Sequence, residues 1–209
     1  MPFQLLEEHY YYIIIALFLL VMSAFVLQKS RSPVNLYFVA TPIIFAIMTI
    51  LTIVNYFIGL GYSYLEVLYL IAPLGVLLSV WYIFHGQQIY KTTFPVIFLT
   101  LYIVYVAVNQ IMFFYPDLSQ NAYTINHFVV TIPMSIALFN FLKLKLEIPE
   151  QAKQINILVI GIVINIMGFV IRGIVSYTDK TESIEGLVVT IVGIIIVIFA
   201  FRTISKTSS

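Results

Sequence analysis

Seven almost entirely apolar stretches restrict this chain to folds that a lipid bilayer can accommodate. A hydrocarbon core about 30 Å thick is crossed by roughly 20 residues of α-helix, since each residue rises about 1.5 Å. The stretches cover residues 9–28, 34–60, 65–84, 92–115, 124–142, 154–177 and 186–204. They predict an all-α fold, a polytopic membrane protein in which residues 1–209 form a single seven-transmembrane helix bundle.

The composition agrees with membrane insertion, because 62% of the residues are apolar and only 9% are charged. Soluble domains are nearer half apolar and about a quarter charged. The net charge of +1 gives a nucleic-acid partner no electrostatic support, and the absence of cysteine excludes thiol chemistry. We therefore expect a multi-pass integral protein of the cell membrane, with the lipid bilayer as its main surroundings.

The charged residues sort by side of the predicted membrane. Eight of the ten basic residues fall in connections on one side: Lys29, Arg31, Lys91, Lys143, Lys145, Lys153, Arg202 and Lys206. Seven of the nine acidic residues fall on the other: Glu7, Glu8, Glu66, Asp117, Asp179, Glu182 and Glu185. Because Lys and Arg accumulate in short cytoplasmic connections, this pattern predicts an N-terminus outside and a C-terminus inside.

Arg172 is the clearest ionisable residue inside a predicted span. An ionisable side chain at the centre of a membrane helix costs roughly 2.5–3.5 kcal/mol on insertion scales, so it marks a candidate functional position. Helical spacing places it on one face with Gln154, Gly161, Asn165 and Gly168, and this face should point into the bundle. Two interpretations stay open: a helix-packing seam in which Asn165 is a polar clasp and Arg172 reaches the headgroups, or a ligand-lining wall.

Two further spans place polar side chains at a similar outer depth. Asn109 lies near the end of the span 92–115, and His127 near the start of the span 124–142. If these faces converge, Asn109, His127, Asn165 and Arg172 form a polar cavity that opens to the outside. The competing interpretation of His127 is a residue merely anchored at the membrane interface. Prolines at 42, 73, 95 and 133 predict kinks, which serve equally well as pivots or as static wedges.

Several chemistries lack their required residues. The last span, GLVVTIVGIIIVIFAFRTI, has no lysine for a retinal Schiff base, and no span holds the paired aspartates of an intramembrane protease. A Gly-x-Ser-x-Gly serine and a His-Glu-x-x-His metal motif are also missing. We predict no catalytic residues, no metal, no retinal or other cofactor, and no enzyme activity. The acidic residues are assigned to connections, so no buried Asp, Glu or His relay is expected.

Three segments resemble the N-terminal seven-helix membrane region of prokaryotic sensor histidine kinases and related receptors. They are LQKSRSPVNLYFVA, EIPEQAKQINILVIGIVINIMG and SIEGLVVTIVGIIIVIFAFR. The resemblance implies a module that senses a signal outside or within the membrane and biases the cytoplasmic ends of its helices. The sequence continues only to SKTSS, without a kinase region, so signalling is expected to pass to a separate cytoplasmic protein.

Three functions are therefore considered. The first is a seven-helix sensor or receptor-like protein that signals through a separate partner. The second is a non-enzymatic structural subunit of a membrane complex, suggested by the long apolar surfaces of the first and last spans. The third is a small-solute transporter or channel, ranked last because buried charge is scarce.

Overall fold

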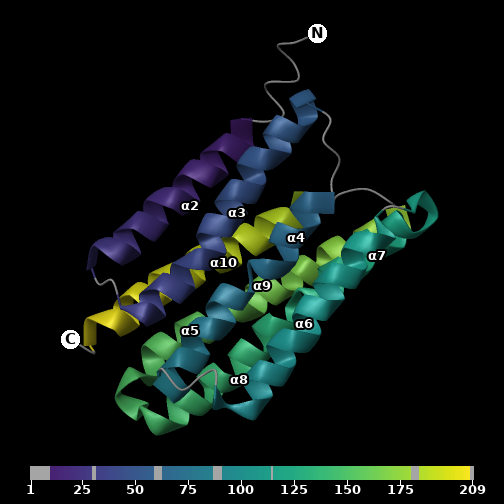
Figure 1. Cartoon of the computed structure of the whole chain (residues 1–209). Helices are drawn as coiled ribbons and strands as arrows, with labels where there is room; N and C mark the ends of the chain where they lie inside the picture. Colours follow the sequence, from purple (N-terminus) through teal and green to yellow (C-terminus); the bar gives the residue numbers. More distant parts are fainter. Residues whose placement is uncertain are drawn as a thin grey trace.

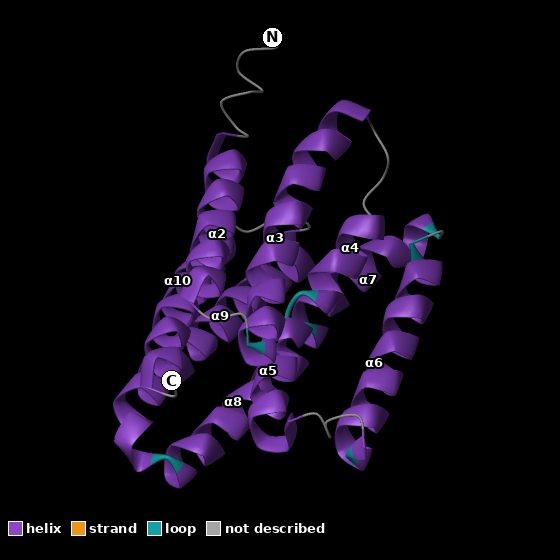
Figure 2. Ribbon diagram, turned by 60° about the vertical axis from the view of Figure 1, so that its left-hand side comes forward, coloured by secondary structure: helices purple, strands orange, loops and turns teal. Residues whose placement is uncertain are grey.

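The computed structural model describes residues 10–29, 32–58, 63–86, 91–113, 115–179 and 184–207, and the regular structure among them is entirely helical (Figure 2). The elements are α2 (Tyr10–Lys29), α3 (Pro33–Ile58), α4 (Ser63–Ile71), α5 (Leu74–His85), α6 (Thr93–Met112), α7 (Pro116–Val129), α8 (Thr131–Glu147), the short 3-10 helix η2 (Pro149–Gln151), α9 (Ala152–Asp179) and α10 (Ile184–Thr207). The predicted all-α class is confirmed for these residues.

Five helical segments are long and apolar enough to cross a bilayer. They are Pro33–Asn55, Leu65–His85, Thr93–Met112, Asn121–Glu147 and Pro149–Thr178. Two shorter apolar helical segments accompany them, Ile13–Gln28 and Glu185–Phe201. The chain is therefore a multi-pass membrane protein, as its hydropathy predicts.

Some predicted boundaries differ from the observed ones. The non-helical connection expected between the spans 92–115 and 124–142 is wrong, because α7 already begins at Pro116. Proline favours the first helical position, where its fixed φ suits the helix and its missing N–H costs nothing. The span limits at residues 9 and 60 lie outside the described residues, as do Glu7, Glu8, Arg31 and Glu182 of the charge pattern.

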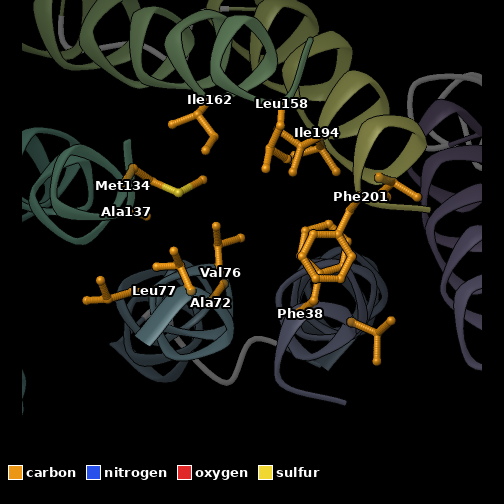
Figure 3. Packing of buried hydrophobic residues seen from close by; sticks show 14 of the residues in the cluster. Phe38, Ala72, Val76, Leu77, Met134, Ala137, Leu158, Ile162, Ile194 and Phe201 are labelled. Atoms are coloured by element: carbon orange, nitrogen blue, oxygen red, sulfur yellow. The ribbon is translucent and has the colours of Figure 1, made fainter. Parts of the chain in front are cut away.

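The helices pack around one apolar core, with α6 at the edge of the bundle beside α4 and α7 (Figure 1). Helix α3 packs against α2 and α5, and α9 packs against α7, α8 and α10. In the core, buried side chains from α3, α5, α8, α9 and α10 face one another (Figure 3). The rings of Phe38 and Phe201 stack there with centroids 3.7 Å apart.

The third predicted span is two helices rather than one, because Pro73 separates α4 from α5. In hydrocarbon, the backbone groups freed at such a break must find partners within the protein. The hydroxyl group of Thr41 on α3 donates to the Ala72 carbonyl at 2.6 Å and accepts from the Val76 N–H at 3.1 Å. Gly75 permits this approach, since a methyl group there would lie only 2.6 Å from Thr41 Oγ1.

Helices α9 and α10 share the most extensive contact among the described helices, and they approach closely at Gly161 and Gly168 of α9 and Gly186 and Gly193 of α10. A methyl group at Gly193 would lie 2.6 Å from the backbone nitrogen of Asn165, which is closer than a real contact allows. Small residues let two membrane helices approach until their backbones touch. The glycine-bearing face of α9, predicted to point into the bundle, is buried here.

We expect Thr41→Val to destabilise the protein, because valine keeps the shape of threonine but leaves Ala72 C=O and Val76 N–H without the hydroxyl group between them. The loss should be about 1–3 kcal/mol, the cost of stranding the buried Val76 N–H group, while the Ala72 carbonyl keeps a hydrogen bond from the Gly75 N–H at 3.2 Å. Thermal unfolding in detergent micelles measures it. Thr100→Val is the matched control, since the Thr100 hydroxyl bonds only to Val96 C=O within α6 and is exposed. An equal effect of the two substitutions would contradict the role given to Thr41.

Candidate functional site

A pocket of about 90 Å³ lies between the short helix α4, the second half of α3 and the second half of α7. Six helices, α2, α3, α4, α7, α9 and α10, contribute to its wall. Apolar side chains alternate there with seven polar ones: Thr49, Thr52, Glu66, Tyr69, Tyr123, His127 and Arg172. A small apolar-walled cavity with a few convergent polar groups is the usual form of a binding site for a small molecule.

The pocket wall contains one acidic and one basic side chain, those of Glu66 and Arg172. Glu66 on α4 is 6% exposed and Arg172 on α9 is 9% exposed. The guanidinium carbon of Arg172 lies 5.3 Å from the centre of the Tyr69 ring, a cation–π distance. Glu66 and Tyr69 are three residues apart on α4, so they share one helical face. The pocket wall therefore holds a guanidinium group against the Tyr69 ring and a carboxyl group three residues before Tyr69 on the same face of α4.

The expectation that the bundle holds no buried Glu or His is wrong. Glu66 was predicted with the outer acidic residues, yet its carboxyl group lies inside, against α7. His127 is 1% exposed. The physical reason is that α4 enters the bundle at its first turn, which carries Glu66 below the surface before the helix breaks at Pro73.

Asn126 holds the Glu66 carboxyl group in place. Its amide nitrogen donates to Glu66 Oε2 at 2.7 Å and to Asn109 Oδ1 at 3.0 Å. Its amide oxygen accepts from Asn109 Nδ2 at 2.8 Å and from the Tyr105 hydroxyl group at 2.9 Å. Both ends of the Asn126 amide are thus used, and the network joins the pocket to α6.

His127 packs as an anchored ring within the pocket wall. Its Nδ1 lies 2.9 Å from the Tyr123 carbonyl oxygen one turn earlier. A carbonyl oxygen only accepts, so Nδ1 carries the hydrogen and donates it to this oxygen. The ring centres of Tyr123 and Tyr69 lie 4.7 and 5.1 Å away. His127 is therefore positioned by α7 and α4 and lies buried inside the bundle.

The four residues predicted to bind a ligand occupy three places. His127 and Arg172 line the pocket together, whereas Asn109 reaches it only through Asn126 and Glu66. Asn165 lies apart, where its amide nitrogen donates to the Thr190 carbonyl of α10 at 3.0 Å. This bond is the clasp expected of the packing-seam interpretation.

Sequence reasoning missed Glu66 and Asn126 as parts of the site. A signal existed for Glu66, because it lies within the predicted span 65–84 although it was counted with the connections. A signal also existed for Asn126, because it lies within the predicted span 124–142 next to His127, whereas the exposed Asn121 of the same helix lies before that span. Among the described residues, no group of three or more His, Asp or Glu side chains could hold a metal ion.

We expect Asn126→Leu to lower the thermal stability, since it removes the hydrogen bonds of Glu66, Asn109 and Tyr105 in one step. Hydrogen bonds to charged groups are worth about 1.5–3 kcal/mol each, so the loss should exceed about 2 kcal/mol. Unfolding in detergent measures it, with Asn121→Leu as the exposed control on the same helix. Equal stability of the two variants would show that the network does not support the fold.

With this geometry established, comparison of the chain with protein-family models, curated proteins and solved structures finds no match.

Proposed function

We propose that this chain is a receptor-like membrane sensor that binds a small polar solute in the pocket between α3, α4, α7 and α9. One observation carries the proposal: Glu66, His127 and Arg172 from three different helices line one buried cavity. Burying such groups is costly, so a protein with few charges places them where they have a task. Binding a polar molecule is a task that suits all three.

The proposal includes seven spans with the N-terminus outside and the C-terminus inside the cell membrane. Helix α2 has 20 residues and α10 has 24, and about 20 residues suffice to span the hydrocarbon core. Helices α4 and α5 form one span, and α7 and α8 form another. Adding α2 and α10 to the five longer segments then gives seven spans. The pocket then faces the outside, and the exposed Lys143 and Lys153 lie at the opposite end.

Signalling would follow from a shift between helix arrangements. A ligand that touches α4 and α9 at once favours the arrangement in which both contacts fit, and it thereby changes the populations of the states. The Asn126 network transmits the position of Glu66 to Asn109 and Tyr105 on α6. A separate cytoplasmic protein would detect the resulting change at the inner helix ends.

Transport of a small solute is the second candidate, and the break between α4 and α5 favours it. Broken helices line substrate sites in many transporters, and buried carboxyl groups accompany them. Glu66 lies on α4, just before the break at Pro73. Uptake of a bound solute into proteoliposomes separates the two functions, since a receptor binds without producing net flux.

Labelling of single cysteines tests the orientation, because the natural chain has none. Tyr115→Cys is exposed between α6 and α7, and Glu150→Cys is exposed between α8 and α9. We expect a membrane-impermeant maleimide to label Tyr115→Cys in intact cells and Glu150→Cys only after permeabilisation. The reverse pattern would contradict the orientation. Labelling of both in intact cells would contradict the span formed by α7 and α8.

Ligand-induced stabilisation tests the binding function. Purified protein is heated with a panel of small anions, metabolites and lipids, and a true ligand at a hundred times its Kd should add about 2.7 kcal/mol of stability. Arg172→Ala should abolish this gain, whereas Lys153→Ala, exposed at the far end, should retain it. The proposal fails if no compound stabilises the protein or if Arg172→Ala leaves the response unchanged.

A further inference from the structure

We infer that the solute bound in this pocket is a small zwitterion, a molecule that carries a carboxylate and a protonated amine. The inference rests on the proposed binding function and deepens it by naming the chemical class of the ligand. It is drawn from three properties of the pocket: the charges in its wall, its aromatic surface and its size.

The charges of Glu66 and Arg172 in the pocket wall are complementary to the two charges of a zwitterion. Arg172 offers planar N–H donors that match a carboxylate, and Glu66 offers a carboxylate that matches an ammonium group. Asn126 fixes the Glu66 carboxyl group through a 2.7 Å hydrogen bond, so its position is set before a ligand arrives. A preset position lowers the cost of ordering the site on binding.

The aromatic wall favours the same ligand. Tyr123 and Tyr69 line the pocket beside His127, and aromatic faces attract ammonium groups. Arg172 already lies over the Tyr69 ring, which orients the guanidinium group within the wall. The amine end of the ligand is therefore assigned to Glu66, and its carboxylate end to Arg172.

The volume limits the ligand to a few atoms. One water molecule needs about 10–15 Å³ of cavity volume open to its centre. The 90 Å³ of this pocket therefore holds about six to nine atoms of that size. Amino acids with small side chains have this size.

Molecules with only one of the two charges should be rejected. A lone carboxylate makes only the contact with Arg172, and a lone amine makes only the contact with Glu66, so each lacks half of the attraction that a zwitterion finds. A difference in attraction between the correct ligand and its analogues gives a site specificity. The pocket should thus distinguish a zwitterion from either of its halves.

The test measures binding of three matched compounds to the full-length protein in detergent micelles, by calorimetry and by thermal shift. L-alanine carries both charges, propionate lacks the amine, and alaninamide lacks the carboxylate. We expect L-alanine to bind at least about tenfold more tightly than either of the others, since a site built for a polar group strongly disfavours an analogue lacking it. β-Alanine, measured in parallel, reports whether the charge spacing matters.

Glu66→Gln isolates the contribution of the carboxylate. Glutamine still presents an oxygen to Asn126, so the network of hydrogen bonds is retained while the negative charge is lost. In this variant the preference for L-alanine over propionate should fall from about tenfold to about onefold. Glu150→Gln, exposed and remote from the pocket, is the control and should keep the full preference.

The outcomes separate this inference from the proposed function. Equal binding of propionate and L-alanine to the natural protein, or an unchanged preference in folded Glu66→Gln, overturns the zwitterion and leaves a binding pocket in place. Binding of some other solute from the wider panel, with none of L-alanine or β-alanine, does the same. If no solute of either set binds, the proposed function itself fails. Should Glu66→Gln not fold, the comparison of the three compounds on the natural protein still decides.

Discussion

The close contact between α9 and α10 is the interaction on which the rest of the structure depends. Four glycines bring the two backbones together, and the same contact positions the arginine of the pocket. A methyl group at Gly186 would lie 2.5 Å from Arg172 Cγ, so the missing side chain makes room for the arginine stem. In a membrane, where apolar lipid surrounds the helices, such packing rather than hydrophobic burial holds helices together. Structure and candidate function thus share one interface.

Several polar side chains are buried among the described residues, and the hydrogen bonds between helices compensate for a local irregularity or hold a buried side chain. Thr41 supplies the partners missing at the α4–α5 break, and the Tyr102 hydroxyl group donates to the Leu70 carbonyl at 2.9 Å close to the same break. Asn126 similarly satisfies Glu66. Because unsatisfied polar groups cost several kcal/mol in hydrocarbon, these bonds specify one arrangement of the helices. The break in turn lets α4 bring Glu66 to the pocket while α5 fills the core.

The position of the pocket is informative about mechanism. One of its walls, α9, is held by backbone contact with α10, whereas the opposite wall, α4, is a short helix of 9 residues ending at a proline. A ligand bound between α9 and α4 would contact both helices. Movement of the short α4 would disturb less of the surrounding packing than movement of α9. Local stability varies in this way across most proteins, and binding sites commonly join parts of unequal stability. Both the receptor and the transporter interpretation make use of this asymmetry.

The sequence by itself determined the helical class, the membrane location and most helix positions, because these follow from the length and hydropathy of single segments. It also indicated that the glycine-bearing face of α9 is buried, since helical periodicity groups residues by face. Only the tertiary structure decided which polar residues meet. It brought Glu66 and Asn126 to His127 and Arg172, and it placed Asn165 against Thr190 instead. The reason is physical: convergence depends on how helices rotate and where α4 breaks, and these are set by contacts between segments far apart in the chain.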